Sequence, residues 1–132
     1  MPPLTSDDAF ALSKSFRDLS VALGDFRFAH WNTLSESDRS TLEDEEWSLL
    51  NSASDMITKA VGLTLDESQA GVARLKGATA SAQKAVKTLN DVRKVITVAT
   101  ASVGLAAAIV SKDPGAIAKN AKAVFDAATA SA

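Results

Sequence analysis

The chain contains no cysteine among its 132 residues, so a disulfide, a thiolate metal site and a cysteine nucleophile are all excluded. Tyrosine is also absent, and glycine and proline are sparse, at six and three residues. Because glycine and proline break helices, and because alanine is abundant and has the highest helix propensity, this composition favours helix throughout. A chain of this length predicts one domain, residues 1–132, with a core that needs no cross-links.

Charge of either sign is nearly balanced overall, and the net charge of −2 is too small to indicate nucleic acid as a partner. Its distribution is uneven: twelve acidic against five basic residues up to Asp66, and four against nine from Glu67 onward. We therefore expect an acidic helical hairpin to pack against a basic one. The N-terminal segment has neither the basic nor the apolar stretch of a signal peptide, so we expect a cytoplasmic protein as synthesised, with leaderless export as the alternative.

The N-terminal third predicts a helix over residues 6–32. Thr5 or Ser6 would cap its N-terminus, and acidic residues in the first turn favour the helix dipole. Apolar positions three and four residues apart predict one buried stripe: Ala9, Leu12, Phe16, Leu19, Leu23, Phe26 and His30. Phe10 and Phe28 lie beside this stripe, and we expect them to widen the buried face.

A second helix is predicted over residues 41–63, starting at a capping box formed by Ser40 and Glu43. It carries two apolar stripes. One comprises Leu42, Leu49, Ala53, Met56, Ala60 and Leu63, and the other comprises Trp47, Leu50, Ile57 and Val61. Two stripes predict packing partners on two sides of this helix.

A third, long helix is predicted over residues 67–112, because small and apolar positions keep a three-and-four spacing from Val72 to Val110. Such a helix would measure about 70 Å. The alternative is a break at residues 88–91, where Asn90 and Asp91 could cap a new helix. We favour the continuous helix, since neither glycine nor proline lies at that point. Within its stripe, Ile96 and Val103 are expected in the core.

The clearest boundary in the chain is Asp113-Pro114. Asp113 is suited to an N-cap, and Pro114 to the first helical position, where its missing N–H costs nothing. A last helix follows over residues 114–129. The complete pattern predicts an all-α, antiparallel bundle of four helices, or five if the chain breaks near Asn90, with heptad-like seams.

One stretch, residues 95–111, carries no charge. Its large apolar residues are Val95, Ile96, Val98, Val103, Leu105, Ile109 and Val110. A membrane-spanning helix needs about 20 apolar residues, so this shorter stretch favours a core helix surrounded by the others. The alternative is a membrane-active hairpin over residues 92–128. That arrangement is similar in architecture to pore-forming toxins whose bundles open to insert an apolar hairpin, although no sequence motif supports membership of such a family.

Residues that could carry chemistry do not form a catalytic pattern. The single histidine, His30, has no nucleophile or orienting partner that the sequence identifies, and is expected to cap the carbonyls of its helix or to meet a nearby carboxylate. The acidic run at residues 43–46 lacks the Glu-x-x-His pairs of a di-iron bundle and the spacing of a calcium loop. Since no phosphate loop or nucleophile elbow is present, we expect no enzyme activity, no cofactor and no small-molecule substrate.

The two tryptophans, Trp31 and Trp47, flank the first predicted turn and are the candidate interface residues, with Trp31 the more exposed. We expect the protein to be a non-enzymatic helical module. It would act through helix–helix interaction, either with copies of itself or with a larger helical protein. The alternative is the membrane-active use of residues 92–128.

Overall fold

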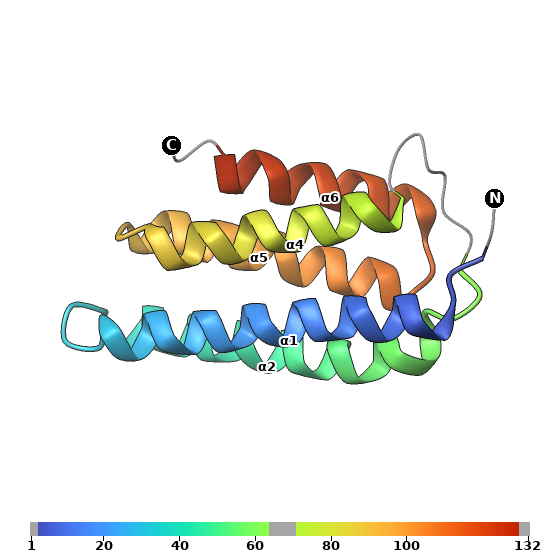
Figure 1. Cartoon of the computed structure of the whole chain (residues 1–132). Helices are drawn as coiled ribbons and strands as arrows, with labels where there is room; N and C mark the ends of the chain where they lie inside the picture. Colours follow the sequence, from blue (N-terminus) through green and yellow to red (C-terminus); the bar gives the residue numbers. More distant parts are fainter. Residues whose placement is uncertain (1–2, 64–70, 130–132) are drawn as a thin grey trace.

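The computed structural model describes residues 3–63 and 71–129, and this part of the chain is all-α, without a β-sheet. It forms five helices: α1 (Ser6–Ala29), α2 (Glu36–Lys59), α4 (Val72–Thr88), α5 (Val92–Val110) and α6 (Pro114–Thr129). Helices α1 and α2 lie side by side, α4 and α5 pack on them, and α6 packs on α4 and α5 on the side away from α1 and α2 (Figure 1). We call α1 and α2 the first layer, and α4, α5 and α6 together the second. Consecutive helices run antiparallel, so α1, α4 and α6 point the same way. The predicted all-α class is confirmed.

Helix α1 begins at a complete capping box. The Thr5 hydroxyl accepts a hydrogen bond from the Asp8 backbone N–H at 3.1 Å, and the Asp8 carboxylate accepts one from the Thr5 N–H at 3.3 Å. The predicted N-cap at Thr5 is therefore confirmed. The helix ends at Ala29, before the predicted residue 32, and His30 takes the C-cap position.

Helix α2 begins earlier than predicted. Ser35 is the N-cap, and its hydroxyl accepts a hydrogen bond from the Asp38 N–H at 3.0 Å. The predicted capping box at Ser40 and Glu43 is wrong, because both residues lie inside the helix. At the other end the helix stops at Lys59, and Gly62 adopts a positive φ of 86° that suits glycine.

The long helix predicted over residues 67–112 is wrong; its first residues lie outside the described part, and the rest forms two antiparallel helices. Leu89 is extended, and the Asp91 carboxylate caps α5 by accepting from the N–H of Arg93 at 3.0 Å. Helices α1 and α2 span 24 residues each, or about 36 Å. A continuous helix would project far beyond them and leave part of its apolar surface in water, whereas folding back at residues 89–91 lets one side of α4 and one side of α5 pack against the other helices.

The last boundary agrees with the sequence. Pro114 is the first residue of α6, the Asp113 carboxylate accepts a hydrogen bond from the Ala116 N–H at 3.1 Å, and the helix ends at Thr129.

The core lies between the α1–α2 pair and the α4–α5 pair and continues between α6 and its neighbours α4 and α5, so that it joins all five helices. Its largest fully buried side chains are Phe16, Leu12, Leu19, Leu23, Leu42, Leu49, Met56, Leu75, Leu105, Ile109, Ile117 and Val86. Two buried serines of α1 also donate hydrogen bonds to carbonyls of α2: Ser13 to Ala53 at 2.7 Å and Ser20 to Glu46 at 2.9 Å. These bonds are seven residues apart and fix the alignment of the α1–α2 hairpin.

Candidate functional site

Large apolar side chains are exposed on one layer of the described molecule only. They are Phe10, Val21, Phe28, Trp31, Trp47 and Val61, all from the α1–α2 hairpin or the turns at its ends. The expectation that Phe10 and Phe28 widen the buried face is wrong, since these side chains are 55% and 67% exposed. Exposed aromatic side chains gathered on one layer are typical of an interaction surface.

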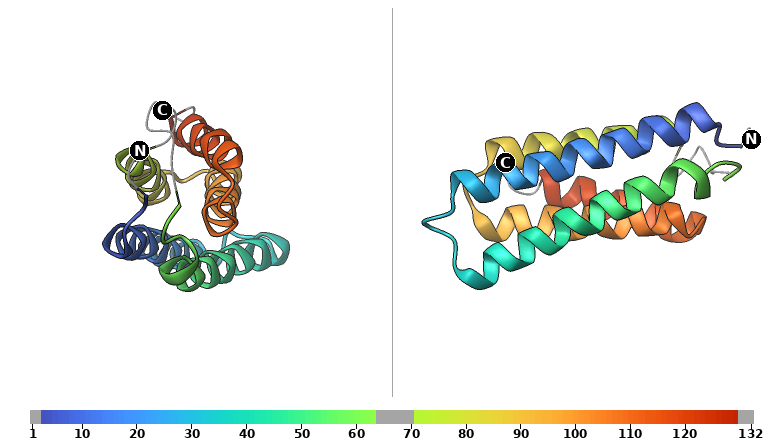
Figure 2. Two further views of the ribbon diagram at one scale, coloured as in Figure 1. Left: turned by 90° about the vertical axis from the view of Figure 1, so that its right-hand side faces the viewer. Right: turned by 90° about the horizontal axis from the view of Figure 1, so that it is seen from below.

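Helical periodicity places most of these side chains along the contact between α1 and α2, on the side away from the core. On α1, the contact with α2 is marked by Ser13 and Ser20, and the next positions around the helix, away from the core, carry an exposed stripe. On α2 the second stripe predicted from the sequence turns the same way. We call this surface the hairpin face and define it by Phe10, Arg17, Val21, Phe28, Trp47, Leu50, Ile57 and Val61. The right-hand view of Figure 2 looks onto this side, with α1 and α2 in front.

At the tip of the hairpin, aromatic and arginine side chains stack on one another. The rings of Phe28 and Trp31 lie 6.1 Å apart at an interplanar angle of 13°. The Arg27 guanidinium lies 4.6 Å from the Phe28 ring centre, and the Arg39 guanidinium lies 4.6 Å from that of Trp31. Tryptophan and arginine are enriched among the residues that dominate binding energy, so the tip has the composition of an interface centre.

An ion pair with Glu46 fixes the position of the Arg27 side chain. Its Nε donates to the Glu46 carboxylate at 2.7 Å, and both side chains are largely buried. The hydrogen bond with Glu46 raises the pKa of Arg27 above its ordinary value, and the nearby charges of Glu46 and Glu43 act in the same direction. This pair fixes the guanidinium plane beneath Phe28 and leaves the aromatic ring facing solvent.

The structure does not bring the two candidate tryptophans together. Trp31 lies in the turn after α1, whereas Trp47 lies near the middle of α2, because that helix starts at Glu36. Trp47 is the more exposed of the two, at 59% against 42%, which reverses the expected order. Both stay candidate interface residues, one at the tip of the hairpin and one at its centre.

The uncharged stretch forms α5, which packs against α2, α4 and α6 and has one side open to solvent. Val95, Val98, Leu105 and Ile109 are buried. The expectation that Ile96 and Val103 belong to the core is wrong: both are half-buried, as is Val110. A new helix begins after the turn at residues 89–91. The stripe predicted from Val72 to Val110 is therefore buried in α4, whereas in α5 it lies on the outer side.

Length and composition would allow α5 to cross a membrane, and 44% of its apolar window is buried in the bundle. Core helices of soluble proteins have the same properties, so these properties alone do not identify a membrane segment. The expectation that other helices surround this helix completely is also wrong, because Thr97, Thr100 and Ala107 are exposed.

Two polar contacts tie α5 to α2. Arg93 forms an ion pair with Asp38, and the Thr100 hydroxyl donates to the Glu45 carboxylate at 2.8 Å. The second oxygen of Glu45 is buried and has no hydrogen-bond partner in the described part of the chain. Burial raises the pKa of Glu45 above its ordinary value, and the Thr100 hydrogen bond partly opposes that shift.

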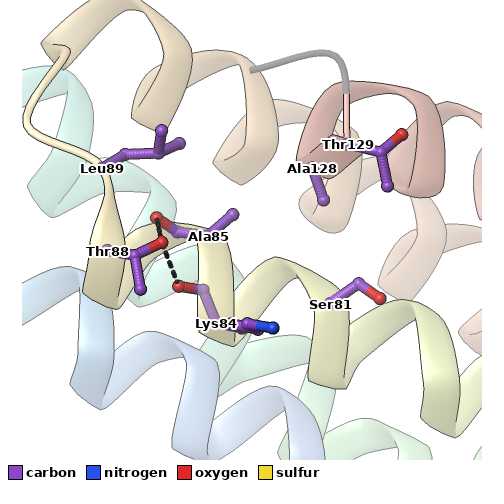
Figure 3. A pocket seen from close by; sticks show the side chains of 7 residues that line it. All are labelled: Ser81, Lys84, Ala85, Thr88, Leu89, Ala128 and Thr129. Atoms are coloured by element: carbon purple, nitrogen blue, oxygen red, sulfur yellow. Dashed lines mark hydrogen bonds between the residues drawn. The ribbon is translucent and has the colours of Figure 1, made fainter. Parts of the chain in front are cut away.

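On the opposite layer, a cleft lies between the C-terminal ends of α4 and α6 (Figure 3). Its volume is about 410 Å³, and its lining is Ser81, Lys84, Ala85, Thr88, Leu89, Ala128 and Thr129. The Thr88 hydroxyl donates to the Lys84 carbonyl at 2.9 Å, within its own helix. Lys84 is the one titratable side chain among the described residues that line this cleft.

A smaller cleft of about 220 Å³ lies beside His30, between α1 and the turn that follows α4. The His30 ring stacks on Phe26 with ring centres 4.2 Å apart, and its Nδ1 lies 3.0 Å from the Phe26 carbonyl oxygen. This is the helix-capping arrangement that the sequence predicts. In the part of the chain that the structure describes, no group of three or more histidine or carboxylate side chains is placed to hold a metal ion.

Charge is separated between the two layers. Residues 3–63 carry eleven acidic and five basic side chains, and residues 71–129 carry three and nine. Among the described residues, one salt bridge, Arg93 to Asp38, joins the layers, and the others lie within a layer. The expected pairing of an acidic with a basic hairpin therefore uses few direct contacts, and most of the charge faces outward.

Comparison of the chain with family models, curated proteins and solved structures gave no match. Its function is therefore argued from the surfaces described above.

Proposed function

We propose that this protein is a non-enzymatic helical module that assembles with copies of itself, and that the hairpin face is the surface through which it does so. The observation that carries the proposal is that every large exposed apolar side chain of the described residues belongs to the α1–α2 layer. Apolar surface of this kind costs free energy in water and is recovered by association.

The size of the surface supports the proposal. Two helices of 24 residues, side by side, present a face about 36 Å long and about 20 Å wide, or roughly 700 Å². A standard protein–protein interface buries about 800 Å² on each partner. The hairpin face is therefore large enough for a stable contact between two folded copies.

Sedimentation equilibrium over a wide range of protein concentration tests this proposal. The wild-type mass should rise above the 13.7 kDa of the single chain as concentration increases. Trp47→Glu places a charge at the centre of the hairpin face and should return the mass to that of the single chain. Ala107→Glu places the same charge on the exposed side of α5 and should assemble like wild type. A wild-type mass that stays at 13.7 kDa throughout would refute the proposal.

A second candidate function is membrane binding through residues 92–128. The observation that favours it is the uncharged outer side of α5, which basic side chains flank at Arg93, Lys94 and Lys112. In this candidate, α5 and α6 leave the bundle and enter a lipid bilayer, where small residues allow helices to approach closely.

A cross-link between α2 and α5 tests the second candidate. The chain has no cysteine, so Glu45→Cys and Thr100→Cys can be joined by a short bis-maleimide without side reactions. Vesicles of phosphatidylcholine and phosphatidylglycerol serve as the probe. The candidate predicts dye release by the unlinked protein and none by the linked one. Equal release by both forms, or no release by either, would rule it out.

A further inference from the structure

The proposed self-assembly leaves open which surface of the second copy receives the hairpin face. We infer that the hairpin face of one copy docks on the cleft between α4 and α6 of the next, so that the copies join head to tail. This inference rests on the proposed function and adds the identity of the receiving surface. Charge, shape and position each support it.

The charges of the two surfaces are opposite in sign. The α1–α2 layer carries six more acidic than basic side chains, and the other layer carries six more basic than acidic ones. Glu43 and Asp44 are exposed beside the hairpin tip, and Lys84 is exposed at the cleft. Opposite potentials across an interface accelerate association and disfavour other pairings. Two hairpin faces that met each other would instead bring their acidic rims together.

The shapes of the two surfaces also match, because one protrudes and the other is hollowed. Phe28 and Trp31 stand out from the hairpin tip, at 67% and 42% exposed. The α4–α6 layer has no large exposed apolar side chain in its described residues, and it is hollowed where Ala85, Leu89 and Ala128 line the cleft (Figure 3). A volume of about 410 Å³ can take an aromatic side chain. Ala85, Leu89 and Ala128 supply apolar atoms to the lining, Ser81, Thr88 and Thr129 supply hydroxyl groups, and Lys84 supplies a cation.

The hairpin tip and the cleft lie at the same end of the bundle. Helices α1, α4 and α6 point the same way, so their C-terminal ends lie at one end of the bundle (Figure 1). Phe28 lies at the end of α1, and the cleft lies at the ends of α4 and α6. A copy stacked on the next without rotation therefore brings its hairpin tip over the cleft. Such a contact is heterologous, because it uses two different surfaces, and it extends into a ring or an open chain.

Two complementary variants test the arrangement. Phe28→Glu disables the hairpin tip and leaves the cleft intact, whereas Lys84→Glu reverses the charge of the cleft and leaves the tip intact. Both positions are exposed, so both variants should fold, which a circular dichroism melt verifies. Each variant alone should sediment at 13.7 kDa. Mixed in equal amounts, they should form a pair of twice that mass that does not extend, because one intact tip meets one intact cleft.

The outcomes separate this inference from the proposed function. Lys94→Glu, a matched charge reversal at an exposed position on α5, should assemble like wild type. If Lys84→Glu also assembles like wild type while Phe28→Glu does not, two hairpin faces meet each other. The head-to-tail arrangement is then overturned, and the proposed function stands. A wild-type protein that is monomeric at every concentration would overturn both.

Discussion

Glu45 lies in an environment that a carboxylate disfavours. Its side chain lies between α2 and α5, where one carboxylate oxygen accepts from Thr100 at 2.8 Å and the other is buried without a partner. A carboxylate in such a place is costly to ionise, because burial removes its hydration and a single hydroxyl replaces only part of it.

The pH dependence of stability follows from this environment. Burial raises the pKa of Glu45 above its ordinary 4.5, so its contribution to folding is fully present below pH 4.5 and is lost as the pH rises through the folded-state pKa. Glu45→Gln removes that loss. Relative to wild type, the variant should therefore gain unfolding free energy between pH 4.5 and pH 7, as measured by urea denaturation. A Glu45→Gln variant whose unfolding free energy changes with pH in parallel with that of wild type would contradict the prediction.

Among the elements, the turn between α4 and α5 decides the topology, and Asp91 is its main polar anchor. Its carboxylate accepts hydrogen bonds from the backbone N–H groups of Arg93 and Lys94. Asp91→Ala should lower the unfolding free energy by about 1 kcal/mol, because those N–H groups lose their partner. Thermal melts check this, and Asp91→Asn, which keeps a capping oxygen, should melt close to wild type. Equal melts for Asp91→Ala and wild type would show that the cap does not stabilise the turn.

The orientation of α5 makes a second prediction at this scale. Leu105 is fully buried, so Leu105→Ala should cost about 2–5 kcal/mol. Val103 lies on the half-exposed side of the same helix. Val103→Ala should therefore lower the unfolding free energy by less than about half the amount for Leu105→Ala. Denaturant unfolding of the two variants compares them directly. A larger loss for Val103→Ala would mean that α5 is rotated relative to the arrangement described here.

For the whole molecule, the separation of charge between the layers bears on the proposed head-to-tail contact. Contacts between the acidic and basic layers of successive copies weaken as salt shortens the Debye length from about 30 Å at 0.01 M to about 3 Å at 1 M. The sedimentation mass of wild type should therefore fall as salt rises over this range. Phe28→Glu should show no such dependence, because it does not assemble. A mass that increases with salt would indicate an apolar contact between like surfaces instead.

Local patterns in the sequence determined the helical class and several boundaries. Thr5 and Asp113 cap their helices as expected, and the stripe from Leu12 to Leu23 is buried, because capping and helical periodicity depend on residues only a few positions apart. The second stripe of α2, with Trp47 and Val61, predicted a packing partner on that side of the helix. In the structure, Trp47 and Val61 are exposed to solvent instead.

Only the tertiary structure decided where the chain folds back and which side of each helix is covered. The spacing of apolar residues continues through residue 89 and favours one long helix, whereas the possible cap at Asn90 and Asp91 favours two, so the local patterns conflict. Helices α1 and α2 span 24 residues each, so they can cover only helices of about that length in the second layer. Asp91 supplies the N-cap with which α5 begins. For the same reason Phe10 and Phe28 are exposed although they are as apolar as their buried neighbours: the position of α2 beside α1, and not their own chemistry, leaves them uncovered.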